Sequence, residues 1–136
     1  MPGRVRRILI AYDGGEPARA ALDVGIEVAR AAGAAVGIVS VVPRGGRAPS
    51  DPWSETSEHA AMLHEARLLI EAAGLSVETH EPTGAAGASI VGVAANFGYD
   101  TIVIGARRLG PIQRTLLGSV SRYVAGHSTA TVIIAR

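Results

Sequence analysis

Residues 5–42 decide the fold class, and they read VRRILIAYDGGEPARAALDVGIEVARAAGAAVGIVSVV. The segment 5–12 ends in a continuous apolar run, which is typical of a strand buried on both faces of a sheet. Pro17 suits the first turn of a helix, and small or apolar residues then recur at three- and four-residue intervals from Ala18 to Ala29. Residues 35–42 form a second apolar, β-branched run. The segment therefore predicts a strand, a helix and a second strand.

The alternation of strands and helices continues to the end of the chain. Further strands are predicted at 75–81, 101–104 and 131–135, and helices at about 54–73, after a turn at 84–88, and near 119–127. We expect the helix that follows this turn to have four residues on its inward face, namely Ile90, Val93, Ala94 and Phe97. Gly33, Gly74 and Gly98 each end a helix shortly before a strand, as left-handed C-caps do.

Strict alternation implies right-handed crossovers and a parallel sheet. Residues 43–53 are rich in Pro and Gly and predict a loop. No second domain is visible, so we expect one α/β domain over residues 1–136. The alternation alone leaves the order of the strands open.

Composition excludes several classes of function. The chain has 136 residues and no Cys, which excludes disulfide scaffolds, thiol catalysis and cysteine-ligated metals. Every one of the 13 basic residues is Arg, so there is no P-loop or Schiff-base lysine. A net charge of +1 gives no general grip on nucleic acid. No apolar run is long enough for a membrane helix, and we expect a soluble, cytoplasmic protein that binds neither nucleic acid nor membranes.

The first candidate site residue is Asp13, directly after the first strand. Open α/β sheets bind ligands outside the carboxyl ends of their strands, where this carboxylate could accept hydrogen bonds from ribose hydroxyls. Alternatively, Asp13 bonds the amides of its own Asp-Gly turn, as is common for this dipeptide. Both interpretations stay open on the sequence alone.

The second candidate is the connection from Gly105 to Ser119. At 15 residues it is long for a compact α/β domain, and such length usually serves a ligand. Its glycines would let the backbone approach a phosphate, and Gly118-Ser119-Val120 opens a helix whose N–H groups favour an anion. The alternative is that Ser119 is only an N-cap and the glycines only form turns.

Nearly the whole chain resembles the universal stress protein family. The similarity rests on ILIAYDGGEPARAAL at 8–22 and on TIVIGARRLGPIQRTLLGSVSRYVAGHSTATVIIAR at 101–136. The family's nucleotide signature is Gly, two residues, Gly, nine residues, then Gly-Ser or Gly-Thr. It matches Gly105, Gly118 and Ser119 with the nine-residue spacing intact, while Arg108 stands in place of the second glycine.

The resemblance implies a doubly wound five-stranded parallel sheet in the order 3-2-1-4-5, with helices on both faces. In nucleotide-binding members the Asp holds ribose, the residue matching Val41 contacts adenine, and the glycine-rich loop holds phosphates. The implied nucleotide site consists of Ala11, Asp13, Val41, Gly105, Arg108, Gly118, Ser119 and Val120.

Three positions depart from the family's pattern. Arg108 could clash with a phosphate, or its guanidinium could grip one. Gly15 stands where the family often has Ser, and Ala85-Ala86 replaces a Gly-Asp-Pro-type turn after Gly84.

Our leading hypothesis is an ATP-binding stress-response protein, with or without Mg²⁺, that has no efficient reaction of its own. The alternative is a nucleotide-free dimeric interaction module of the same fold. An enzyme that transfers phosphate lacks an identifiable base or Lys, and His59 and His64 are not spaced as a helical metal pair. Residues 131–135 are expected to lie at a sheet edge and to pair with a second copy in a homodimer.

Overall fold

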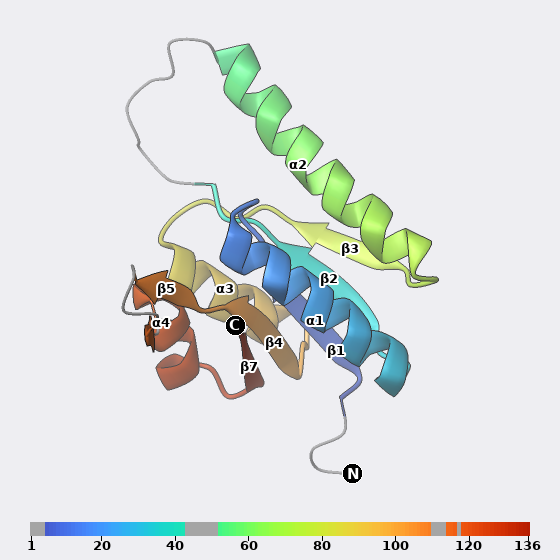
Figure 1. Cartoon of the computed structure of the whole chain (residues 1–136), viewed down its shortest axis with the longest axis vertical. Helices are drawn as coiled ribbons and strands as arrows, with labels where there is room; N and C mark the ends of the chain where they lie inside the picture. Colours follow the sequence, from blue (N-terminus) through green and yellow to red (C-terminus); the bar gives the residue numbers. More distant parts are fainter. Residues whose placement is uncertain (1–4, 43–51, 110–113, 117) are drawn as a thin grey trace.

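The computed structural model describes residues 5–42, 52–109, 114–116 and 118–136, without the side chains of 52–58 and 107–116. Five parallel strands form its main sheet (Figure 1). They are β1 (Arg7–Ala11), β2 (Ala35–Val39), β3 (Val77–His80), β4 (Thr101–Gly105) and β7 (Thr131–Ala135). Their order across the sheet is β3-β2-β1-β4-β7. This is the predicted 3-2-1-4-5 order, so the α/β fold class and the topology implied by the resemblance are both confirmed.

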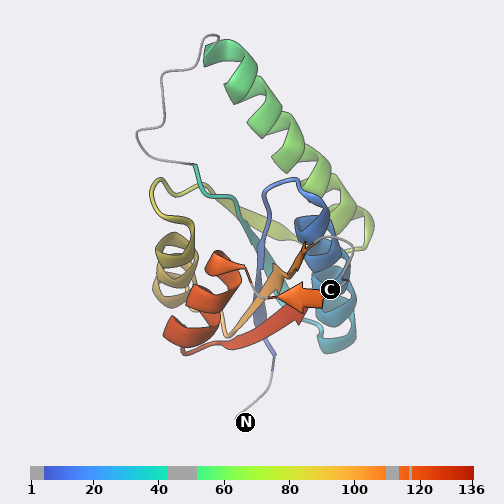
Figure 2. The same ribbon diagram turned by 60° about the vertical axis from the view of Figure 1, so that its left-hand side comes forward.

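Four helices cover the two faces of the sheet. They are α1 (Glu16–Ala32), α2 (Pro52–Ala72), α3 (Ala86–Asn96) and α4 (Ser119–His127). Figure 2 shows α1 and α2 on one side of the strands and α3 and α4 on the other. Within the described residues, no helix is both long and apolar enough to cross a membrane.

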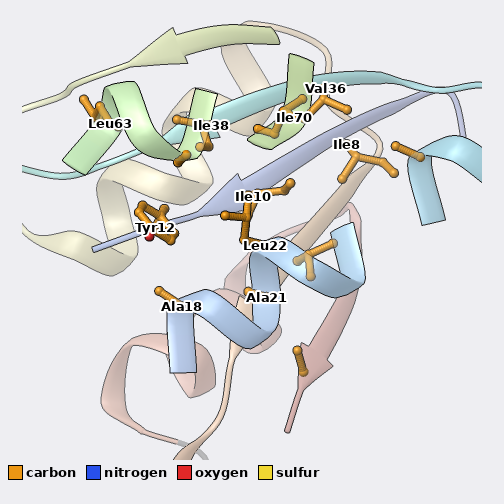
Figure 3. Close-up of a cluster of buried hydrophobic side chains, with 14 of the residues drawn as sticks. Ile8, Ile10, Tyr12, Ala18, Ala21, Leu22, Val36, Ile38, Leu63 and Ile70 are labelled. Atoms are coloured by element: carbon orange, nitrogen blue, oxygen red, sulfur yellow. The ribbon is translucent and has the colours of Figure 1, made fainter. Parts of the chain in front are cut away.

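The alternation of side chains along β1 explains how the sheet supplies two cores. Ile8 and Ile10 are fully buried on the side of α1 and α2, as the close-up of this core shows (Figure 3). Leu9 and Ala11 are buried on the opposite side, against α3 and α4. A central parallel strand must therefore be apolar throughout, which is why residues 8–11 form an uninterrupted apolar run.

Glycines end three helices as the sequence predicts. Gly33, Gly74 and Gly98 have φ angles of 68°, 84° and 71°, in the left-handed region. Each is followed within a few residues by β2, β3 or β4.

Asp100 joins the amino-terminal ends of β1 and β4. Its Oδ2 accepts hydrogen bonds from the amides of Arg6 at 2.9 Å and Arg7 at 3.0 Å. Its Oδ1 accepts a bond from the Thr101 hydroxyl at 2.7 Å. This carboxylate therefore holds the start of β1 beside the start of β4.

Two sequence-based expectations were wrong in detail. Phe97 does not face inward, because α3 ends at Asn96 and Phe97 follows as the C-cap, with 51% of the residue exposed. The loop predicted at 43–53 ends earlier, because α2 begins at Pro52, where a proline is well tolerated. Residues 43–51 lie outside the described part of the chain.

The long connection after β4 contains an additional small sheet. Strands β5 (Arg107–Leu109) and β6 (Arg114–Leu116) pair antiparallel, with Arg108 opposite Thr115. These two strands were not predicted from the sequence, since strands of three residues carry no recognisable alternation.

Candidate functional site

A cavity of about 560 Å³ opens at the carboxyl ends of β1, β2 and β4. It lies where the chain order reverses between β1 and β4, the usual ligand position in an open α/β sheet. Residues from the sheet, from the loops that follow it and from α1, α3 and α4 form its wall. They are Ala11, Tyr12, Asp13, Pro17, Ala18, Val39, Val41, Ala86, Ile90, Ile104, Gly105, Gly118, Ser119, Val120 and Ser121.

The structure brings most of the sequence-predicted residues together around this cavity. They are Ala11, Asp13, Val41, Gly105, Gly118, Ser119 and Val120. Arg108 is the exception: its backbone lies in β5, and its side chain is outside the described part of the molecule.

Asp13 holds its own turn and also faces the cavity. Its Oδ1 accepts a hydrogen bond from the Gly15 amide at 2.9 Å, as the turn interpretation predicted. The residue is exposed and lines the cavity, and among the described residues its Oδ2 accepts no hydrogen bond. One oxygen therefore stabilises the turn, while the other has no hydrogen-bond donor among the described residues. Gly15 keeps the turn uncrowded, since a Cβ there would lie 3.1 Å from Asp13 Oδ1.

Gly105 is required by packing within the protein. A Cβ at this position would collide with the Pro17 carbonyl and would lie 2.8 Å from the Pro17 Cβ. The last residue of β4 thus passes directly beside the first turn of α1, and only a glycine fits there. From the sequence alone, this glycine was interpreted either as allowing a close approach by phosphate or as forming a turn.

The amino-terminal end of α4 forms another part of the wall. Gly118 is the N-cap, with extended backbone, and Ser119 is the first helical residue. The alternative interpretation of Ser119 as an N-cap is therefore wrong. The Gly118 carbonyl accepts bonds from the Ser121 hydroxyl at 3.1 Å and from the Arg122 amide at 2.9 Å. Amides of the first helical turn have no partner within the helix, so those of Ser119 and Val120 are suited to an anion in the cavity.

Apolar side chains provide a surface for a flat ring. Val39, Val41, Ile90 and Ile104 all line the cavity. Val41 lies beyond the end of β2, where the Val42 amide bonds the Pro82 carbonyl at 2.8 Å and the Ser40 amide bonds the His80 carbonyl at 2.9 Å. These bonds on either side hold Val41 at the rim of the site.

The described residues offer no obvious metal centre. No three His, Asp or Glu side chains gather anywhere in the described residues. Among the described residues that line the cavity, Asp13 is the only one with a carboxylate.

A polar and aromatic cluster, missed from the sequence, lies outside the cavity. His80 Nε2 is 2.8 Å from the Tyr99 hydroxyl, and the His80 ring lies 4.6 Å from that of Phe97. The Arg7 guanidinium lies 4.6 Å above the Tyr99 ring. Burial lowers the pKa of His80, although Glu78 acts in the opposite direction. Burial also raises the pKa of Tyr99, and Glu78 adds to the effect.

The one sequence signal for this cluster is Gly37. Its position within β2 is where a glycine often marks a close approach. A Cβ on Gly37 would overlap the Tyr99 phenol.

The family profile described as the universal stress protein family matches residues 4–136. No protein in the curated set that was compared matches the chain.

Solved structures with the same fold agree with that match. A universal stress protein from Archaeoglobus fulgidus is 28% identical with a TM-score of 0.82, over 96% of this chain and 98% of that one. A structure of the Archaeoglobus fulgidus protein in complex with dAMP is 28% identical, with a TM-score of 0.75 over 98% and 99% of the two chains. A universal stress protein in complex with cAMP is 27% identical, with a TM-score of 0.76 over the same shares. The sequence, the sheet order and these matches together show that the chain belongs to the universal stress protein family.

Proposed function

We propose that this protein binds an adenine nucleotide, with ATP as the first candidate, in the cavity between β1 and β4. The observation that carries the proposal is the meeting of three kinds of group around one cavity. An exposed carboxylate, an apolar wall and the free amides of a helix terminus all line it. The carboxylate is complementary to the ribose hydroxyls, the apolar wall to the adenine ring, and the amides to the phosphates.

Each part of the nucleotide has an assigned partner. Asp13 Oδ2 accepts hydrogen bonds from the ribose hydroxyls, and Val41 contacts the adenine ring. The phosphates lie against Gly105 and the amides of Gly118, Ser119 and Val120. Ala11, buried at the end of β1, contributes to the floor beneath the ligand.

The solved relatives support an adenine nucleotide. Two universal stress proteins that are 27% and 28% identical to this chain were solved with cAMP and with dAMP. Both ligands share the adenine ring and a single phosphate. We extend the proposal from these monophosphates to ATP because the connection that follows β4 is long. Mg²⁺ would enter already bound to the triphosphate, since it keeps several waters and is held chiefly by phosphates.

The proposed role is in a stress response and not in catalysis. Efficient phosphoryl transfer requires a group that positions or deprotonates the nucleophile. Among the described residues around the cavity, Asp13 is the only carboxylate, and its Oδ1 is already bonded to the Gly15 amide. No histidine lines the cavity.

We also propose a homodimer that pairs through β7. In the described chain β7 has one neighbouring strand, β4. The Thr131 amide bonds the Asp100 carbonyl at 2.9 Å, so the amides of Val132 and Ile134 point toward the outer edge. An apolar edge strand is normally covered or paired, and a two-fold axis would pair two copies of it.

Calorimetric titration tests the nucleotide proposal. ATP with Mg²⁺, AMP and cAMP are titrated into the wild type, Asp13→Ala and Asp23→Ala. Asp23 is an exposed acid on α1 that is not among the residues lining the cavity. Asp23→Ala therefore changes the net charge by the same amount as Asp13→Ala without altering the cavity wall. Asp13→Ala should weaken binding by about 10- to 100-fold, the value of one or two charge-assisted hydrogen bonds, and Asp23→Ala should leave it unchanged. Absence of heat with all three ligands at millimolar concentration would favour the nucleotide-free module.

A further inference from the structure

The side chain of Met62 on α2 contacts the turn that carries Asp13. Gly14, with φ of 83°, is the residue in contact. A Cβ added at Gly14 would lie 2.7 Å from Met62 Sδ and 3.1 Å from its Cγ. The thioether therefore lies against the backbone of the turn, with no room for even a methyl group between them.

This contact bears on the candidate binding group. The Gly15 amide, one residue further on, bonds Asp13 Oδ1 at 2.9 Å. The geometry of the Asp13-Gly14-Gly15 turn thus sets the direction of the carboxylate. Met62 supports the turn from the α2 side, and the hydrogen bond to Gly15 supports it from within.

Met62 is one of only two sulfur-containing residues in this chain. The sequence has two Met and no Cys, so Met1 and Met62 hold all of its sulfur. Met62 is only partly buried at the border of the core beneath α1 and α2. A methionine that is only partly buried can be reached by two-electron oxidants, and no thiol in the protein competes for them.

We propose that Met62 is a site of reversible oxidation by peroxides, and that its sulfoxide releases the Asp13 turn and weakens nucleotide binding. The effect on affinity rests on the proposed function, whereas the release of the turn does not. In the reaction a sulfur lone pair attacks a peroxide oxygen and the O–O bond breaks. Sulfur gains one oxygen and loses two electrons, and hydrogen peroxide is reduced to water. A methionine sulfoxide reductase would restore the thioether.

The structure explains why the sulfoxide should not fit in place of the thioether. Oxidation converts a flexible apolar group into a polar, chiral one. The new oxygen needs a hydrogen-bond donor and additional volume, whereas the thioether lies so close to the turn that even a methyl group at Gly14 would require the Met62 side chain to shift. Moving the side chain away from the turn is the way to provide both.

The experiment compares three proteins before and after treatment with hydrogen peroxide. They are the wild type, Met62→Leu, which keeps the volume but cannot be oxidised, and Met62→Gln, which is polar without oxidation. Peptide mass spectrometry locates the added oxygen and distinguishes Met62 from Met1. The exchange rate of the Gly15 amide, measured by NMR, reports on the turn, and calorimetry with ATP reports on binding.

We expect Met62 to gain one oxygen in the wild type. Gly15 should then exchange faster, and ATP should bind about tenfold more weakly, which corresponds to about 1.4 kcal/mol. Met62→Gln should show both changes without peroxide, and Met62→Leu should show neither with it. Reductase treatment should restore the wild type.

Two results would overturn the inference. One is a Met62 that stays reduced at peroxide concentrations that oxidise Met1. The other is a fully oxidised Met62 with an unchanged Gly15 exchange rate. If the untreated wild type binds no nucleotide, the proposed function fails, and the exchange rate of Gly15 still decides whether the sulfoxide releases the turn.

Discussion

Replacing Gly105 by alanine tests whether this glycine is required by the protein's own packing. The added Cβ would collide with the Pro17 carbonyl and lie 2.8 Å from the Pro17 Cβ. A backbone carbonyl cannot rotate away as a side chain can, so α1 or β4 must move. Overpacking of this kind costs about 1–3 kcal/mol of unfolding free energy. For a domain of this size, that lowers Tm by roughly 3–15 °C.

Gly92→Ala is the matched control. Gly92 lies inside α3, and a Cβ there would meet nothing within 4 Å. Because alanine favours the helix over glycine, this variant should be more stable by about 0.5–1 kcal/mol. The two variants add the same methyl group and should change stability in opposite directions.

Thermal and urea unfolding of both variants, without nucleotide, measure the effect. Destabilisation of the ligand-free Gly105→Ala protein would show that the glycine serves the contact with α1, whatever it also does for a phosphate. A Gly105→Ala protein as stable as the wild type would refute this reasoning.

Three further outcomes follow from other contacts. Asp100→Ala removes the hydrogen bonds to two backbone amides and to the Thr101 hydroxyl, and urea unfolding should show a loss of about 1–3 kcal/mol; an unchanged midpoint would mean that water replaces the carboxylate. Since burial lowers the pKa of His80, the folded state takes up a proton less readily than the unfolded chain. The contribution of the neutral His80 to the free energy of unfolding should therefore be fully present above pH 6.5 and should decrease as the pH falls below that value. A His80→Gln protein whose stability has the same pH profile as the wild type would contradict this assignment. Val132→Pro removes an amide that points to the outer edge of β7, so sedimentation should show a dimer for the wild type and a monomer for the variant, and a monomeric wild type would refute the dimer.

The strands were predictable because burial on both faces leaves a strong signal. Residues 8–10 are fully buried, and only a continuous apolar run satisfies that environment. The helix ends at Gly33, Gly74 and Gly98 were also predictable from the sequence, since a left-handed backbone strongly favours glycine. The strand order came from the family resemblance, as alternation alone allows more than one order.

The hairpin of β5 and β6 was not predictable. Its strands have three residues each, RRL and RTL, which is too short to show an alternation of apolar and polar residues. Pairing between backbone groups defines them, and pairing leaves little trace in so short a sequence.

The position of the candidate site could be predicted, but several of its contacts could not. Asp13 and Gly105 follow from the rule that ligands lie at the carboxyl ends of strands, and Gly118 follows from the start of the helix that it precedes. The contact of Gly105 with Pro17 and that of Gly14 with Met62 join residues far apart in the sequence. Such contacts depend on how α1 and α2 lie on the sheet, which periodicity does not specify.

A crystal structure of the protein grown with ATP and Mg²⁺ tests nucleotide binding in this cavity most directly. We predict nucleotide density in the cavity between β1 and β4, with a ribose hydroxyl within hydrogen-bonding distance of Asp13 Oδ2. The adenine ring should lie against Val41, and a phosphate should lie at the amides of Ser119 and Val120. An empty cavity at saturating ATP, or a nucleotide bound elsewhere on the protein, would contradict the account.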